Sequence, residues 1–77
     1  MRVQGGDAEK VALECLVKWF SEEMTRRLLE KHAAGYKGWD DPKMTTTDLQ
    51  IKLLDAVSKR KWVDVANFAA MLWNREP

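Results

Sequence analysis

One segment of this sequence constrains the fold more than any other, because residues 8–34 have the pattern of a single uninterrupted helix. Between Asp7, a favourable N-cap, and Gly35, a favourable stop, apolar residues recur at intervals of three and four. At a rise of about 1.5 Å per residue, such a helix is about 40 Å long. A compact chain of 77 residues is too small to cover a rod of that length, so the sequence predicts that a partner covers part of it.

The apolar surface of this predicted helix is wider than a single stripe. Ala12, Cys15 and Trp19 lie beside the main seam rather than opposite it. A helix that is apolar over a wide arc is usually buried on two sides. One side is therefore expected to face its own chain and the other a second copy, which makes a homodimer the expected assembly.

The remainder of the sequence predicts a loop and two shorter helices. Residues 35–44 contain two glycines, an Asp-Asp pair and a proline, which forbid regular structure. Thr45 followed by Asp48 resembles a capping box and marks the start of the second helix. A turn is expected at 58–61, and a third helix from about Trp62 to Arg75.

The expected fold is all-α: one long helix plus an antiparallel helical hairpin, completing a helical bundle by dimerisation. Residues 1–7 are predicted to be a flexible N-terminus and residues 8–77 a single helical domain. The seams predict a core of Leu13, Leu16, Val17, Phe20, Met24, Leu28, Leu49, Leu53, Val57, Val65, Phe68, Ala69 and Leu72.

Charge and composition exclude several classes of protein. A single cysteine cannot form a disulfide within the chain. A net charge of +1 gives no basic surface of the kind that nucleic acids select, so nucleic acid is not an expected partner. No apolar run suits a membrane span and no apolar leader precedes residue 7, which favours a cytoplasmic location. The one basic run, Lys59-Arg60-Lys61, is read as a turn between helices in preference to a phosphate contact.

Few residues suggest catalytic chemistry. Cys15 and His32 both lie on the long helix, too far apart along it to form a nucleophile–base pair. Cys15 is read as a small core residue, and His32 as a residue whose charge suits a helix C-terminus. No catalytic residue is assigned. Trp39, in the loop, either plugs the end of the bundle or acts as a base-stacking or lid residue.

A polar pair in the third helix is the most informative feature. Asp64 and Asn67 are three residues apart, so they share one face of an otherwise apolar helix. Burying such a pair is costly unless the polar atoms are satisfied. The pair therefore requires a metal ion, a ligand or a hydrogen-bonding neighbour.

The stretch around this pair resembles a known family. Asp-Val-Ala-Asn-Phe-Ala-x-Met-Leu, residues 64–72, is similar to the C-terminal helix motif of the MazG-like all-α nucleoside triphosphate pyrophosphohydrolases, especially the short versions carried by bacteriophages. Phe20 to Leu28 resembles the opening helix of that family, Lys37-Gly38-Trp39 its loop, and Leu49 to Val57 its next helix. The similarity covers roughly residues 19–75.

The resemblance implies Mg²⁺-dependent cleavage of nucleoside triphosphates to the monophosphate and pyrophosphate. The family holds its metals with a Glu-Glu-x-x-Glu run on one helix and a Glu-x-x-Asp run on the next. Hard oxygen ligands suit Mg²⁺, which neutralises phosphates and orients an attacking water. If the chain is active, Asp64 and Asp48 are the candidate metal ligands, with Glu22 or Glu23 as further candidates.

The sequence departs from the family at the metal ligands. Lys61-Trp62-Val63-Asp64 keeps the aspartate of the second run and replaces its glutamate with lysine. At the first run, Asp48-Leu49-Gln50-Ile51-Lys52 keeps one acid and places an ammonium at a ligand position.

Asp48, Lys52 and Asp55 have two interpretations. They form an exposed charge ladder in which Lys52 bridges both acids. Alternatively, Lys52 replaces the metal charge in a relic nucleotide pocket.

Two functional hypotheses follow from the resemblance and the departure. The leading one is a catalytically degenerate MazG-like phage protein, in the cytoplasm of a bacterial host cell, that binds a nucleotide or a host or defence protein and needs no cofactor. The alternative is a minimal Mg²⁺-dependent pyrophosphohydrolase. The candidate nucleotide-binding residues are Asn67, Trp39, Lys37 and Lys52.

Overall fold

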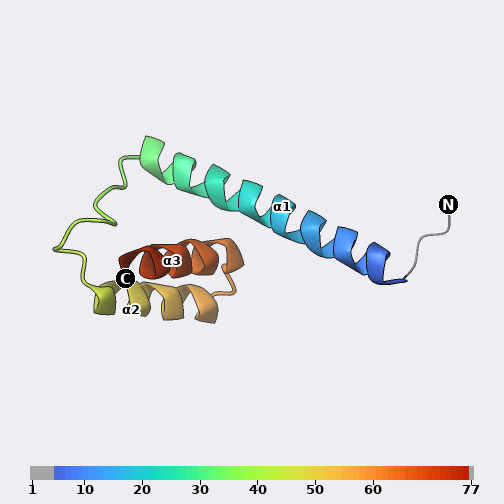
Figure 1. The fold of residues 1–77 in the computed structure, drawn as a ribbon. Helices are drawn as coiled ribbons and strands as arrows, with labels where there is room; N and C mark the ends of the chain where they lie inside the picture. Colours follow the sequence, from blue (N-terminus) through green and yellow to red (C-terminus); the bar gives the residue numbers. More distant parts are fainter. Residues whose placement is uncertain (1–4, 77) are drawn as a thin grey trace.

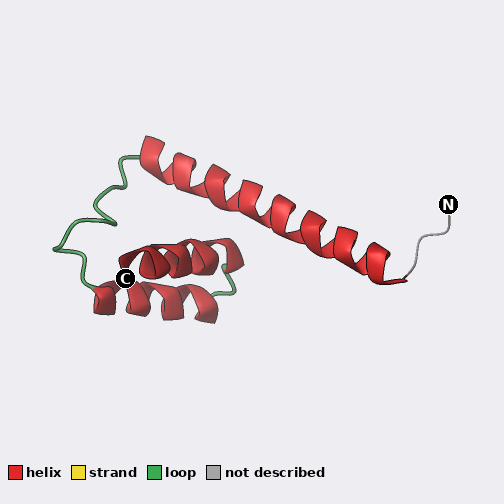
Figure 2. Cartoon of the chain, viewed as in Figure 1, coloured by secondary structure: helices red, strands yellow, loops and turns green. Residues whose placement is uncertain are grey.

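The chain folds into three helices in a computed structural model, which describes residues 5–76 (Figure 1). They are α1 (Gly5–Ala33), α2 (Thr46–Ser58) and α3 (Trp62–Arg75). Within residues 5–76 all regular secondary structure is helical, which confirms the all-α class (Figure 2). None of the helices in this range is both long and apolar enough to cross a membrane.

The first helix is slightly longer at its start than the spacing predicts. Residues 5–7, expected in a flexible N-terminus, form the first turn of α1, and residues 1–4 of that segment lie outside the described residues. Asp7 is therefore inside the first turn, where its charge favours the helix dipole, and is not the N-cap. At the other end, Gly35 adopts φ +94° and the Tyr36 N–H donates to the Lys31 carbonyl, so the helix stops where predicted.

The start of α2 is a complete capping box. Thr45 Oγ1 accepts a hydrogen bond from the Asp48 N–H, and Asp48 Oδ2 accepts one from the Thr45 N–H, each 3.0 Å long. Two backbone donors at the helix start, which have no partner within the helix, are satisfied in this way. The capping pair predicted from the sequence is confirmed.

The Thr45→Ala variant is expected to lose about 1 kcal/mol of unfolding free energy, because it removes one half of the capping box. Thermal and urea unfolding measure this loss. The Thr45 backbone N–H, and then the Thr45 hydroxyl, lower the pKa of the Asp48 carboxyl. Because the variant loses only the hydroxyl, this pKa should move part of the way back toward its ordinary value, which NMR titration of the carboxyl measures. Serine at position 45 keeps the hydroxyl and is the matched control. Equal stability of the alanine and serine variants would contradict a structural role for the cap.

The turn between α2 and α3 ends a helix without glycine or proline. Arg60 takes the left-handed conformation, with φ 57°, and the Lys61 N–H donates to the Ala56 carbonyl over 2.9 Å. A residue other than glycine adopts left-handed backbone angles at a steric cost. The packing of α2 against α3 must therefore compensate for this cost at Arg60. The run Lys59-Arg60-Lys61 is thus a turn between helices, as its structural interpretation predicted.

The three helices are packed unevenly. α2 and α3 lie side by side and run in opposite directions, and we call them together the α2–α3 pair (Figure 1). Among the described residues, α1 contacts α3 but not α2. Leu49, with 1% of its surface exposed, and Ala56 are the buried apolar residues, and both come from α2.

The predicted core is correct for only about half of its residues. Leu49 is buried, and six others are half-buried: Phe20, Met24, Leu53, Val65, Phe68 and Leu72. The prediction is wrong for the remaining six in this single chain, because they are exposed: Leu13, Leu16, Val17, Leu28, Val57 and Ala69. The physical reason for the first three is that the N-terminal half of α1 extends past the α2–α3 pair (Figure 1).

Candidate functional site

Asp64 lies at the start of α3, buried against α1. Only 7% of the residue is exposed, and its Oδ1 lies 3.3 Å from Arg27 Nε and 3.4 Å from Lys31 Nζ. Arg27 and Lys31 are four residues apart on α1, so both cations project from one face of that helix. The negative charge also lies in the first turn of α3, where the helix dipole favours it. Asp64 therefore joins α3 to α1 as the acceptor of a two-cation ion pair.

Asn67 lies one turn further along α3 and contacts the backbone of α1. It is 4% exposed, and its Nδ2 donates to the Met24 carbonyl over 3.2 Å. A helical carbonyl has a second lone pair, so it accepts this bond in addition to its own helical one. The Oδ1 of Asn67 has no hydrogen-bond partner among the described residues. The polar pair predicted to need a metal, a ligand or a neighbour is thus mainly satisfied by a neighbour, α1.

These contacts form one unit, which we call the interhelix cluster: Arg27, Lys31, Asp64 and Asn67. Lys31 Nζ also lies 5.5 Å from the centre of the Phe68 ring, a distance suited to a cation–π contact. In the sequence, Glu23, Arg27 and Lys31 are spaced by four residues, which predicts a charge ladder on the solvent-facing side of α1. That placement is wrong, because both side chains are partly covered by α3.

Asp48, the second candidate metal ligand, is exposed, and its Oδ2 already accepts the hydrogen bond of the capping box. The Thr45 backbone N–H, and then the Thr45 hydroxyl, hold the pKa of the Asp48 carboxyl below its ordinary value, with smaller contributions from the charges of Lys52 and Arg75. A carboxyl with a lowered pKa stabilises the fold while it is ionised. Its contribution is present above the ordinary pKa and is lost as the pH falls through the lowered one.

The charge ladder predicted on α2 contains a different salt bridge from the ones that the sequence predicts. Asp55 forms its salt bridge with Lys59, at 3.0 Å, and not with Lys52. Lys52 lies within 4.0 Å of no carboxylate in the described part of the chain. The prediction that Lys52 bridges Asp48 and Asp55 is therefore wrong.

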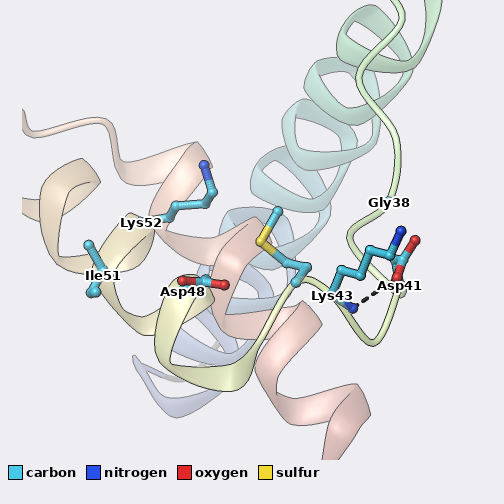
Figure 3. A pocket seen from close by; sticks show the side chains of 7 residues that line it. Gly38, Asp41, Lys43, Asp48, Ile51 and Lys52 are labelled. Atoms are coloured by element: carbon cyan, nitrogen blue, oxygen red, sulfur yellow. Dashed lines mark hydrogen bonds between the residues drawn. The ribbon is translucent and has the colours of Figure 1, made fainter.

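A shallow hollow of about 500 Å³ lies where the loop meets the start of α2 (Figure 3). Asp48 and Lys52 line it, and the Lys52 ammonium points away from the Asp48 carboxylate (Figure 3). The loop side is held by the Lys43 N–H, which donates to Asp41 Oδ1 over 2.8 Å. The hollow is lined by Gly38, Asp41, Lys43, Met44, Asp48, Ile51 and Lys52.

The remaining candidate nucleotide-binding residues lie elsewhere. Trp39 and Lys37 belong to the loop but do not line the hollow, and Asn67 is buried in the interhelix cluster. The Trp39 carbonyl accepts a hydrogen bond of 2.6 Å from Arg75 Nη2, which ties the loop to the end of α3. Trp39 as a whole residue is 40% exposed. The four candidate residues therefore do not converge on one cavity.

The two candidate metal ligands, Asp48 and Asp64, do not converge on one site. Asp48 lies in the first turn of α2 and Asp64 in the first turn of α3, so the side-by-side packing of helices that run in opposite directions puts the two acids near opposite ends of the α2–α3 pair (Figure 1). No three His, Cys, Asp or Glu side chains within residues 5–76 gather as potential metal ligands. Around Asp64, two cations occupy the space that a metal ion would need.

The sequence pattern missed Arg27 and Lys31 as partners of Asp64. A signal for them exists, because Phe20, Met24, Arg27 and Lys31 continue one spacing of four, three and four along a single face of α1. The apolar half of that seam was recognised. The pattern alone predicts a solvent-facing position for the two cations at its end, because long charged side chains are usually exposed.

Comparison of the chain with protein-family models, with curated proteins and with solved structures finds no match. The resemblance to the MazG-like family accordingly remains a hypothesis that depends on the motif at residues 64–72. The geometry of the interhelix cluster does not depend on this resemblance, because its contacts are observed in the structure of this chain.

Proposed function

We propose that this protein is a catalytically degenerate, MazG-like helical protein that acts by binding another protein and performs no metal-dependent chemistry. The observation that carries the proposal is the ion pair of Asp64. The one acid that the motif retains at a metal-ligand position is buried against Arg27 and Lys31. A carboxylate held by two cations is a structural partner of those cations and a poor ligand for a divalent ion.

A protein is favoured over a nucleotide as the bound partner. The groups expected to recognise a triphosphate are spread over the loop, α2 and the interhelix cluster. In contrast, large apolar side chains are well exposed on the α2–α3 pair, with Trp73 at 77%. Exposed aromatic and branched side chains are typical of protein-binding surfaces. Those that support this interpretation are Ile51, Leu54, Trp62 and Trp73. By resemblance to phage proteins, the partner is a host or defence protein.

The test of the first half of this proposal is a direct assay of the rival activity. The protein is incubated with each nucleoside and deoxynucleoside triphosphate and Mg²⁺ or Mn²⁺, and pyrophosphate release is measured. We expect no release above the protein-free blank. The Asp64→Asn variant tests the key acid, and Asp55→Asn, an exposed acid on α2, is the matched control. Turnover that is lost with Asp64→Asn and kept with Asp55→Asn would overturn the proposal in favour of a minimal pyrophosphohydrolase.

The second half of the proposal is tested by capture and reconstitution. Immobilised wild-type protein and the Trp73→Ala variant are exposed to bacterial lysate, and a protein retained only by the wild type is purified and titrated back. We expect saturable binding that weakens with Trp73→Ala, while Lys59→Ala, a change at an exposed polar site, leaves it unchanged. Recovery of this chain alone, with saturable nucleotide binding, would favour the nucleotide instead.

A further inference from the structure

The loop and α1 lie against the same side of the α2–α3 pair. Arg75 of α3 donates a hydrogen bond to the Trp39 carbonyl of the loop, and Asp48 and Lys52 of α2 line the hollow beside the loop (Figure 3). Asp64 of α3 contacts α1. At about 100° per residue, Asp64 and Arg75 project from the same side of α3. This side of the pair is therefore the one that the rest of the chain occupies.

The opposite side of the pair, which we call the far face, presents large apolar side chains. On α3 these side chains lie roughly half a turn from Asp64, and on α2 they lie about 150° from Lys52. They are Leu54, Val57, Trp62 and Trp73, and their exposed fractions range from 38% to 77%. The three charged residues of α2 and the two of α3 project from other sides. A large apolar surface of this kind marks an interaction site.

The spacing of the two tryptophans indicates what kind of segment fits the far face. Trp62 and Trp73 are eleven residues apart, so they are separated by about 16 Å along α3, or about three turns of a helix. An extended peptide is disfavoured, because packed helices offer no free backbone edge with which it could pair. A helix satisfies its own backbone groups, and its side chains can pack between the two indoles.

One end of the far face is basic. The turn at residues 59–61 adjoins Trp62, and within residues 5–76 neither Arg60 nor Lys61 forms a salt bridge. Two unpaired cations beside an apolar surface favour a partner that carries carboxylates at that end. An anionic membrane is a poorer match, because membrane recognition relies on clusters of about four to eight basic residues.

We propose that the far face binds an amphipathic helix of the partner protein, about three turns long, with its apolar stripe between Trp62 and Trp73 and its acidic end over Arg60 and Lys61. This inference rests on the proposed function, because it specifies the binding segment of a protein partner. The indoles supply most of the buried apolar area, since large aromatic side chains are the usual anchors of an interface. The charges at the turn determine the direction in which the helix lies.

The chemistry of the binding segment is tested by selecting a displayed library of random peptides, about 16 residues long, on the wild-type protein. We expect the enriched peptides to share apolar residues at intervals of three and four and to carry Asp or Glu at one end. A synthetic peptide of the enriched sequence should become helical on binding, as circular dichroism measures. Enrichment of no peptide, or of peptides without the helical spacing or the acidic end, would overturn this inference. A lysate protein whose capture depends on Trp73 would in that case still support the proposed function.

Titration of that peptide into variants tests the two tryptophans. Trp62→Ala and Trp73→Ala should each raise the peptide Kd at least about tenfold, because each removes an aromatic anchor. Trp19→Ala is the matched control, since Trp19 is 63% exposed and lies on α1, away from the far face. An unchanged Kd in both far-face variants, or an equal rise with Trp19→Ala, would overturn the proposal.

The basic end is tested with the same peptide. The double variant Arg60→Gln with Lys61→Gln should raise the Kd about 3- to 10-fold, which is the effect expected for two exposed ion pairs. Lys52→Gln removes a cation that forms no salt bridge within residues 5–76 and lies on the loop side, so it should leave the Kd unchanged. Equal effects of the double variant and of Lys52→Gln would contradict an acidic end over the turn.

Two other occupants of the far face are tested with the protein alone. Wild-type protein and Trp73→Ala are compared by cosedimentation with phosphatidylserine vesicles and by sedimentation equilibrium. We expect neither vesicle binding nor self-association that depends on Trp73. Vesicle binding lost in Trp73→Ala would show that a lipid surface covers the far face, and a dimer lost in Trp73→Ala would show that a second copy does. Either result would overturn the proposal.

Discussion

Replacing Leu49 with alanine is expected to lower the free energy of unfolding by about 2–5 kcal/mol, the usual cost of truncating a fully buried leucine. Leu49 is 1% exposed and lies on α2 where α2 packs on α3. The described chain buries only one other apolar residue, Ala56, so there is little core to compensate for a cavity. Because small domains have a free energy of unfolding near the lower end of about 5–15 kcal/mol, most of the variant should be unfolded at modest urea concentrations.

The same helix provides matched controls for this prediction. Leu54→Ala removes the same atoms from a residue that is 65% exposed and should cost less than about 1 kcal/mol. Leu53→Ala, at a half-buried site, should fall between the two. Urea unfolding followed by circular dichroism measures all three. A cost below about 1 kcal/mol at Leu49 would mean that α2 does not pack on α3 through this face.

Removing the charge of Asp64 is expected to have the second largest effect on stability. Asp64→Asn keeps the shape of the side chain but leaves Lys31 without its carboxylate partner and Arg27 with only Glu30, 3.7 Å away. The loss of a partner from a buried ion pair costs about 3–5 kcal/mol, and this value is reduced here because both cations are partly exposed. We therefore expect a loss of about 1–3 kcal/mol, measured by urea unfolding at neutral pH.

A double-mutant cycle separates the ion pair from other effects of this change. Arg27→Met removes one cation and keeps the apolar part of its side chain. In the Arg27→Met background, Asp64→Asn should cost distinctly less than in the wild-type protein, because one of the two repelling cations is gone. Strict additivity of the two substitutions would contradict the ion pair. Asp55→Asn, at the exposed Asp55–Lys59 pair, should change stability by less than about 0.5 kcal/mol.

The helices and their ends were predictable from the sequence where a local rule determines them. The capping box depends on only two residues, Thr45 and Asp48. The end of α1 depends on a single residue that can adopt a positive φ, Gly35. The third helix has the bounds that its apolar spacing predicts. At Gly5 the prediction failed, because Asp7 is equally favourable as an N-cap and as a first-turn acid, and the pattern cannot distinguish them.

The site was less predictable because it depends on how helices distant in sequence meet. The sequence indicates that Asp64 and Asn67 share a face and need a partner, but not that Arg27 and Lys31 supply it. The partners are determined by the position at which α3 packs on α1. The apolar pattern of each helix on its own does not predict that position. The same limit affects Asp48 and Asp64. The resemblance to the MazG-like motif implies that these two acids converge, whereas the packing of α2 on α3 separates them.

The role of Asp64 as an ion-pair partner is tested most directly by titrating Mn²⁺ into isotope-labelled protein, with and without a non-hydrolysable nucleoside triphosphate, and recording the paramagnetic broadening of each backbone amide by NMR. The ion pair with Arg27 and Lys31 predicts no saturable broadening centred on the start of α3, and no difference there between the wild-type protein and Asp64→Asn. Saturable broadening centred on Asp64, lost in Asp64→Asn and kept in Asp55→Asn, would show a metal site and contradict a non-catalytic role.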